Sequence, residues 1–107
     1  LDAEMPPRYL TAAAAVIPHP QKPSKVGEDA NLIYHLPNGS SVIGVADGVG
    51  DWAKRGIDAG IFARQLMRET KKAALNAEVL DPSVLLHDVW AAMKQPQGGT
   101  VLQGSST

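Results

Sequence analysis

The chain has 107 residues, of which 44% are hydrophobic and 20% charged, and its formal net charge is −1. This size and composition fit one small globular domain or a part of one, and the scattered basic residues and few aromatic residues argue against a nucleic-acid or anionic-membrane surface. Cysteine is absent, which excludes disulfides, zinc–thiolate sites and thiol catalysis, and no apolar run approaches the ~20 residues of a membrane span.

The first quarter of the chain is rich in prolines and shows little hydrophobic periodicity. Residues 1–9 contain two consecutive prolines and predict an extended lead-in. The run 10–17 leaves helix and strand equally open, because its four alanines favour a helix whereas its short length and the prolines after it allow a strand. Residues 18–25 then form a loop that contains three prolines and the two lysines Lys22 and Lys25.

A β-hairpin is predicted over residues 30–46. Residues 30–36 alternate in polarity, with Leu32 and Tyr34 on one side of the strand. The turn falls at residues 37–40, because their Asn-Gly pair supplies the positive φ angles of a tight turn. The return strand, residues 42–46, is apolar on both faces, so we expect it to be central in a sheet and covered on both sides.

Acidic residues flank this hairpin at both ends. Asp47 follows the return strand and precedes a glycine-rich turn, and Glu28 and Asp29 precede the first strand. A carboxylate at the end of a buried strand needs a compensating charge, which a cation or a metal ion supplies. Each site alone has a plainer interpretation as a solvated turn, but the hairpin brings the two together and predicts a centre for a hard metal ion.

Two amphipathic helices are predicted in the second half of the chain. The first begins near Asp58 and the second at Asp81 followed by a proline, since aspartate caps free backbone N–H groups and proline suits the first helical position. The apolar face of the first helix comprises Ala59, Phe62, Ala63, Leu66, Thr70, Ala73 and Ala74. That of the second comprises Leu86, Val89, Trp90 and Met93. Two helices packed on a hairpin indicate an α+β layered fold.

The tryptophans and histidines are interpreted as structural residues. Trp52 is predicted to pack beside the acidic site, and Trp90 to lie in the core between helix and sheet. The histidines show no spacing typical of metal ligands. We therefore expect His19 in a loop, His35 on a strand face and His87 on a helix surface.

Four stretches, in order and at matching spacing, resemble the PP2C-type (PPM) metal-dependent protein phosphatases, and within them the PPTC7-like organellar branch. The stretches are Gly27–Ala30, Gly44–Trp52, Gly56–Asp58 and Phe62–Met67, and the ending Gly104–Thr107 resembles the opening of the next core strand. The resemblance covers roughly residues 15–107. It implies a layered β-sandwich flanked by helices, of which residues 10–107 would form the N-terminal part with strands, a hairpin and two helices.

The resemblance also implies an activity, which is hydrolysis of phosphoserine or phosphothreonine in phosphoproteins by water activated on two Mn²⁺ or Mg²⁺ ions. Asp47 resembles the aspartate that bridges both metals, and the carbonyl of Gly48 resembles a ligand beside it. Glu28 and Asp29 resemble the acidic pair that binds the cluster. No side chain serves as nucleophile.

Three departures from the family qualify this expectation. Lys22 and Lys25 stand where many members have a phosphate-binding arginine, and lysine lacks the bidentate fork. Asp51 replaces a glycine of the branch. The family completes its metal site with aspartates from a second half that these 107 residues do not contain, so we expect the fragment alone to be inactive.

The alternative is a non-catalytic, PP2C-derived subunit that serves as a packing module in a larger assembly. The localisation implied by the branch is organellar, in the mitochondrion or the chloroplast.

Overall fold

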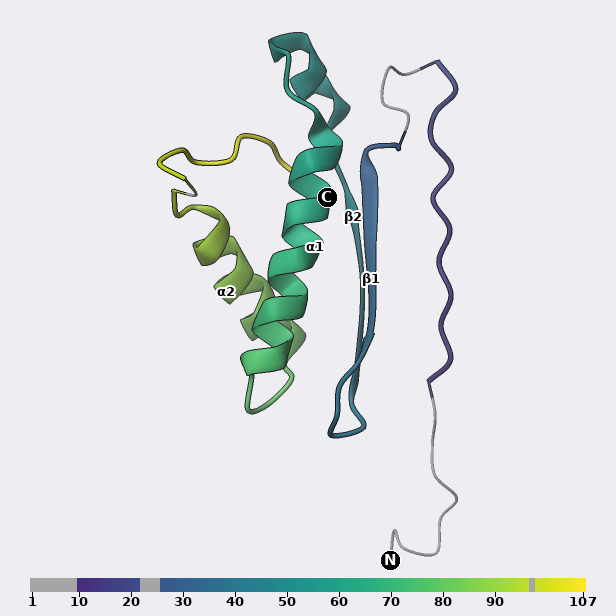
Figure 1. Cartoon of the computed structure of the whole chain (residues 1–107), viewed down its shortest axis with the longest axis vertical. Helices are drawn as coiled ribbons and strands as arrows, with labels where there is room; N and C mark the ends of the chain where they lie inside the picture. The colour runs from purple at the N-terminus through teal and green to yellow at the C-terminus, as the bar shows by residue number, and fades with distance from the viewer. Residues whose placement is uncertain (1–9, 22–25, 97) are drawn as a thin grey trace, which may run out of the picture.

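The computed structural model of this chain describes residues 10–21, 26–96 and 98–107. The lead-in expected over residues 1–9, together with Lys22 and Lys25, lies outside the described residues. The described part contains a hairpin and two helices, so it is α+β as predicted. Figure 1 shows α2, α1, the hairpin and an extended N-terminal segment side by side.

The hairpin pairs β1 (Asp29–His35) with β2 (Ser41–Asp47) in antiparallel register. At its turn the Leu36 N–H donates to the Ser40 carbonyl oxygen at 2.7 Å. Gly39 takes φ +90°, whereas no non-glycine residue in the described segments has a positive φ. The predicted hairpin is therefore confirmed, but glycine alone of the Asn-Gly pair supplies the left-handed conformation.

One face of the hairpin forms the core with α1 (Ala59–Asn76). Ala30, Leu32 and Ala46 pack there against Ala63 and Met67, and all five are buried. The described residues cover the opposite face only in part, since Ile43 is 59% and Val45 83% exposed although the segment 10–17 runs past them. The expectation that the return strand is covered on both sides is thus wrong here, because successive side chains point to opposite faces and α1 covers only one.

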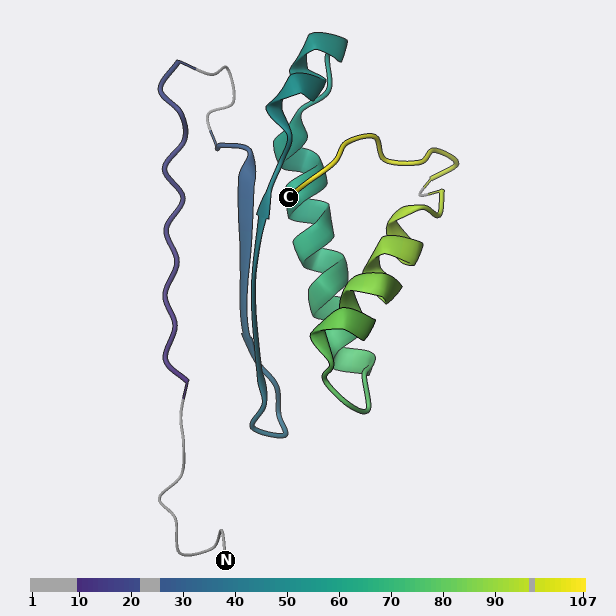
Figure 2. The same cartoon turned by 180° about the vertical axis from the view of Figure 1, so that it is seen from behind.

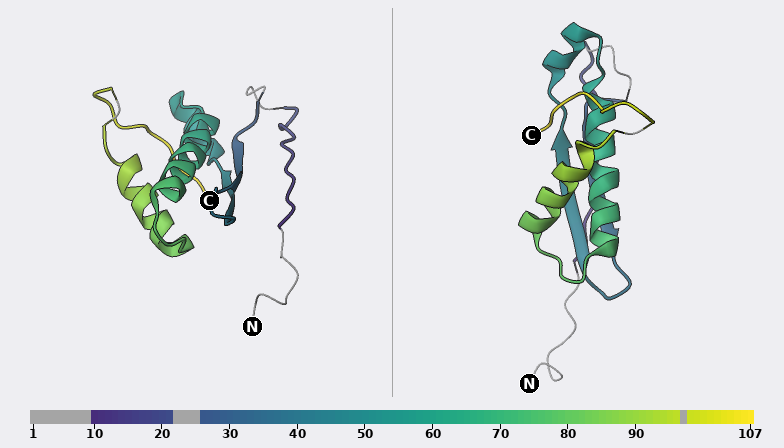
Figure 3. Two further views of the ribbon diagram at one scale, coloured as in Figure 1. Left: turned by 60° about the horizontal axis from the view of Figure 1, so that its bottom comes forward. Right: turned by 90° about the vertical axis from the view of Figure 1, so that its left-hand side faces the viewer.

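The segment 10–17, for which helix and strand were both open, is neither, because it is extended and joins no ladder. Proline at position 18 favours this outcome, since the residue before a proline is disfavoured in helical conformation. The segment runs beside the hairpin on the side away from α1 (Figures 1 and 3). It leaves a gap of about 300 Å³, lined by Ala12–Ala14 on one side and by Ile43 and Val45 on the other.

Both helices begin where their capping residues predict. The Oδ1 atom of Asp58 accepts from the Gly60 N–H at 2.8 Å at the start of α1. The Oδ1 atom of Asp81 accepts from the Ser83 N–H at 2.9 Å at the start of α2 (Pro82–Met93). Hydrogen bonds from the Ser83 hydroxyl and from backbone N–H groups lower the pKa of Asp81 from its ordinary value of 3.8.

The buried stripes of the helices differ in part from the prediction. In α1 the buried set includes Met67, which the sequence analysis did not place on the apolar face. In α2 the buried residues are Leu85, Val89 and Met93, at i, i+4 and i+8. Leu86 is 60% and Trp90 56% exposed, so the core position expected for Trp90 is wrong.

The cause lies in the layering of the two helices. Within the described residues α2 packs on α1 and does not contact either strand. Figure 3 shows the resulting order of α2, α1, hairpin and extended segment. The prediction that both helices lie on the sheet is therefore wrong for α2. Its buried stripe keeps the predicted Val89 and Met93 but contains Leu85 in place of Leu86.

The C-terminal residues return to the sheet beside β2. Asp47 and Thr107 exchange two backbone hydrogen bonds of 2.9 Å, and the Val49 N–H donates to the Ser105 carbonyl oxygen at 3.0 Å. Gly48 and Ser106 form an antiparallel bridge. Figure 2 shows this segment, in yellow, passing from the end of α2 across α1. The end of β2 therefore has β1 on one side and residues 105–107 on the other.

Candidate functional site

The acidic residues meet at one end of the hairpin. Asp29 and Asp47 are direct partners in the register, and both are exposed. The backbone N–H and C=O of Asp47 bond to Thr107, so the two aspartates form a non-hydrogen-bonded pair, in which opposite side chains approach most closely. Their carboxylates therefore lie side by side at this end of the hairpin.

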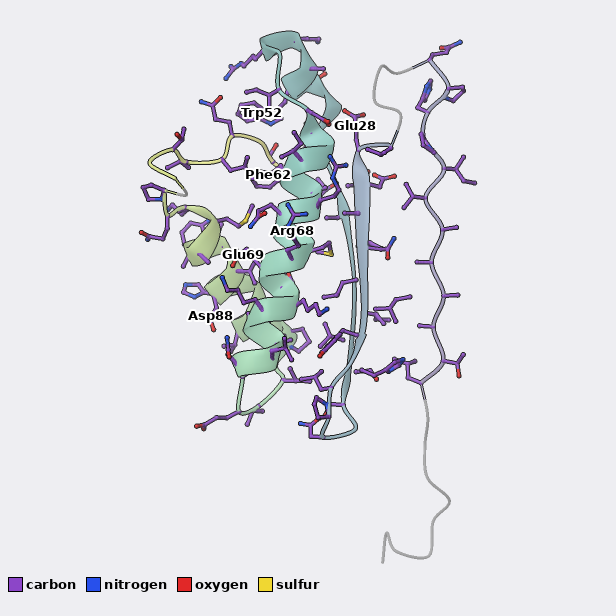
Figure 4. All side chains as sticks on the ribbon, in the orientation of Figure 1. Glu28, Trp52, Phe62, Arg68, Glu69 and Asp88 are labelled. Atoms are coloured by element: carbon purple, nitrogen blue, oxygen red, sulfur yellow. The ribbon has the colours of Figure 1, made fainter. Side chains whose placement is uncertain are left out.

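An open pocket of about 390 Å³ adjoins this pair. One side of the pocket carries Glu28, Asp29 and Asp47, and the other carries residues 17–20. Figure 4 shows Glu28 at the start of β1, beside the first turns of α1. The predicted meeting of Asp47 with the acidic pair is therefore present in the fold, since all three carboxylates line one pocket.

The carboxylates do not by themselves enclose a metal ion. Across residues 10–21, 26–96 and 98–107, no three histidine, cysteine, aspartate or glutamate side chains are grouped closely enough to hold one. The oxygen donors at the pocket are the type that Mg²⁺ and Mn²⁺ prefer. The described residues thus fit part of a ligand set for such ions, and any complete set needs oxygen ligands from outside them.

Gly48 holds the end of β2 against two other backbone segments. Its N–H donates to the Glu28 carbonyl oxygen at 3.0 Å. A Cβ atom at this position would lie 2.5 Å from the carbonyl oxygen of Ala59 and 2.6 Å from that of Glu28, so only glycine fits. In the described part of the chain no donor bonds to the Gly48 carbonyl oxygen. Gly48 itself is buried and is not among the described residues that line the acidic pocket.

The first turn of α1 packs equally closely on the segment before β1. A Cβ atom on Gly60 would lie 2.5 Å from the Gly27 carbonyl oxygen. The Arg64 guanidinium folds back over this turn, with Nη2 3.9 Å from Oδ2 of Asp58. Its Nη1 is buried and makes no hydrogen bond within the described residues. Arg64 is therefore partly enclosed by its packing on the first turn of α1.

The C-terminal segment is held beside the site by two aromatic residues. The Nε1–H of Trp52, in the 3₁₀ helix η2 (Gly50–Arg55), donates to Oγ of Ser105 at 2.8 Å. Gly104 lies against the Phe62 side chain so closely that a Cβ atom would come within 2.6 Å of Phe62 Cβ. Figure 4 shows Trp52 and Phe62 on the same side of the molecule. The prediction that Trp52 is a packing residue beside the site is confirmed.

The structure also places two further residues that the sequence analysis named, Asp51 and His19. Asp51 is highly exposed and forms an ion pair with Lys54 at 3.6 Å, so its charge has a partner on the same helix. His19, for which the sequence predicted only a loop position, lines the acidic pocket. The phosphate-binding prediction for Lys22 and Lys25 falls on residues that the structure does not describe.

Curated relatives of this chain carry phosphatase names. It is 43% identical over 74 residues to "Probable protein phosphatase 2C BIPP2C1" of Oryza sativa subsp. japonica, a match to 69% of this chain and 12% of that protein. It is 37% identical over 101 residues to "Probable protein phosphatase 2C 80" of Arabidopsis thaliana, covering 92% and 22%. It is 43% identical over 86 residues to "Protein phosphatase PTC7 homolog fig" of Drosophila virilis, covering 78% and 27%.

The matches involve most of this chain but a small share of each relative. The chain spans 12 to 27% of the length of these three proteins. No family model matches the sequence, and no solved structure matches it. None of the helices in the described segments has the length and apolar character needed to cross a membrane.

Proposed function

Since the chain belongs to the PP2C-type protein phosphatases and has PTC7-like relatives, we propose that it forms the N-terminal part of a serine/threonine phosphatase domain that depends on two Mn²⁺ or Mg²⁺ ions. The observation that carries the proposal is the direct opposition of Asp29 and Asp47 at the end of the hairpin, where both line one pocket. Their carboxylates supply the oxygen ligands that Mn²⁺ and Mg²⁺ prefer, which supports a shared metal site.

Each site residue has a role in this proposal. Asp47, the Gly48 carbonyl oxygen, Glu28 and Asp29 would hold the metal ions. Gly48 also fixes the position of Asp47, because its N–H is bonded to the Glu28 carbonyl oxygen. Lys22 and Lys25 contribute positive charge for the substrate phosphate. The bound metals supply an activated water and stabilise the charge of the phosphoryl group.

The substrate class is a phosphoprotein, and the fold of the complete domain is a layered β-sandwich flanked by helices. The exposed outer face of the hairpin supports the second point, since Ile43 and Val45 form an apolar surface suited to a second sheet. The PTC7-like relatives support an organellar location, in the mitochondrion or the chloroplast.

A second candidate is a non-catalytic subunit that keeps this part of the domain as a packing module. The same exposed residues, Ile43 and Val45, favour it, because a partner protein of a larger assembly would cover them equally well. The two candidates differ in what Asp47 does, since catalysis needs its carboxylate and packing does not.

The test measures the release of phosphate from a phosphoserine peptide by the full-length protein, with and without Mn²⁺. Asp47→Asn removes the charge at nearly constant shape, and Asp88→Asn is the matched control because Asp88 lies exposed on α2. The enzyme proposal predicts Mn²⁺-dependent activity that falls at least a hundredfold in Asp47→Asn and not in the control. Absence of activity in the folded wild-type protein would favour the packing module.

A further inference from the structure

His19 faces the three carboxylates across the acidic pocket. It lies on the side formed by residues 17–20, opposite Glu28, Asp29 and Asp47. Among the described side chains that line this pocket, His19 is the one that can donate a hydrogen bond, since the others are carboxylates, apolar residues or glycine. A group bound in the pocket can therefore receive a hydrogen bond from this imidazole.

The hydrogen bonding of the ring fixes what it can offer. The Gln21 N–H donates to Nδ1 of His19 at 3.1 Å. Because Nδ1 accepts this bond, the neutral ring carries its proton on Nε2. The lone pair of Nδ1 is then engaged by the Gln21 N–H, and Nε2 is left as a donor. The ring offers a donor, and the partner of a donor is an oxygen acceptor.

The backbone around His19 is restrained in a way that suits a binding group. Prolines stand on both sides of it, at positions 18 and 20. A residue that precedes proline is confined to extended conformations, so this part of the segment loses little freedom when it binds. A donor on a restrained backbone binds more tightly than one on a flexible loop.

From these observations we infer that His19 binds the phosphoryl group in the pocket, donating from Nε2–H to a terminal oxygen of the substrate phosphomonoester and of the inorganic phosphate product. The inference rests on the proposed function, because metal ions on the carboxylates would attract an oxyanion into this acidic pocket. It makes His19 a substrate-binding residue in addition to the proposed Lys22 and Lys25.

The first test compares His19→Ala, His19→Gln and the control His87→Ala, whose histidine is exposed on α2. His19→Ala should raise both the KM for a phosphoserine peptide and the inhibition constant of inorganic phosphate about tenfold, the size expected for one hydrogen bond to a charged group. His19→Gln keeps a donor of similar reach and should recover part of the loss. The Mn²⁺ concentration for half-maximal activity should stay unchanged, as should all constants of His87→Ala.

A second readout separates this inference from the proposed function. Inorganic phosphate is added to the wild-type protein in Mg²⁺, and the imidazole nitrogen resonances are followed by NMR. A shift at His19 and none at His87 supports the inference even if no phosphatase activity is found. An unmoved His19 resonance would overturn it, as would a His19→Ala variant whose KM and phosphate inhibition equal those of wild type, or one in which only kcat falls.

Discussion

Replacing Gly48 by alanine tests how closely three backbone segments meet at the acidic site. The added Cβ would lie 2.5 Å from the Ala59 carbonyl oxygen and 2.6 Å from that of Glu28. Both are backbone atoms, so no side-chain rotation relieves the overlap. Overpacking of this kind costs about 1–3 kcal/mol, and loss of the Gly48 N–H bond to Glu28 adds about 1 kcal/mol. We expect the free energy of unfolding to fall by about 2–4 kcal/mol.

The matched control is Gly44→Ala on the same strand. There a Cβ atom would lie 3.5 Å from Sδ of Met67, which is ordinary van der Waals contact. This substitution should leave the stability unchanged or raise it by up to about 1 kcal/mol, because alanine loses less backbone entropy than glycine on folding. Urea denaturation followed by tryptophan fluorescence measures both variants. Equal midpoints for the two would refute the close backbone contact at Gly48.

Three further substitutions probe the packing around the site and its supports. Trp52→Phe removes the hydrogen bond to the C-terminal segment, so it should lower the free energy of unfolding by about 1 kcal/mol and speed amide exchange at residues 105–107. Trp90→Phe, at a position that is 56% exposed, should change neither quantity. Equal exchange rates in the two variants would contradict the role of Trp52. Met67→Ala should lower the free energy of unfolding, measured by urea denaturation, by about 2–4 kcal/mol because Met67 is buried against the hairpin. Val45→Ala should lower it little. The reverse order would show that the two faces of the hairpin are misassigned. The hydrogen bonds that Asp81 accepts lower its pKa. Its contribution to stability is therefore present above its ordinary pKa of 3.8 and is lost as the pH falls through the lower pKa of the folded state. Lowering the pH should thus reduce the stability of the wild type more than that of Asp81→Asn, and parallel stability-versus-pH profiles would contradict this.

The features that the sequence predicted correctly are set by neighbouring residues. Asp58 and Asp81 cap their helices because the capping carboxylate and its N–H partner are two residues apart. Gly39 lies in the turn between β1 and β2 because only glycine adopts its left-handed conformation without strain. The hairpin then brings Asp29 opposite Asp47, so the acidic half of the candidate site was also predictable.

The features that the sequence missed depend on residues distant in the chain. The buried stripe of α2 runs through Leu85 rather than Leu86, because α2 packs on α1 and not on the sheet. Nothing in the local pattern distinguishes these two leucines. His19 reaches the acidic pocket through the path of the extended segment, and Arg64 folds over the first turn of α1 through packing. Neither position leaves a signal in the spacing of residues.

The measurement that tests the metal centre most directly is paramagnetic broadening by Mn²⁺ in NMR spectra of the protein. Bound Mn²⁺ broadens the signals of nearby nuclei, so it locates the ion independently of catalysis. The account predicts that the amide signals of Asp29, Asp47 and Gly48 broaden first, and that Asp47→Asn abolishes this selective effect while Asp88→Asn preserves it. Broadening centred elsewhere, or unchanged in Asp47→Asn, would contradict a metal centre at the end of this hairpin.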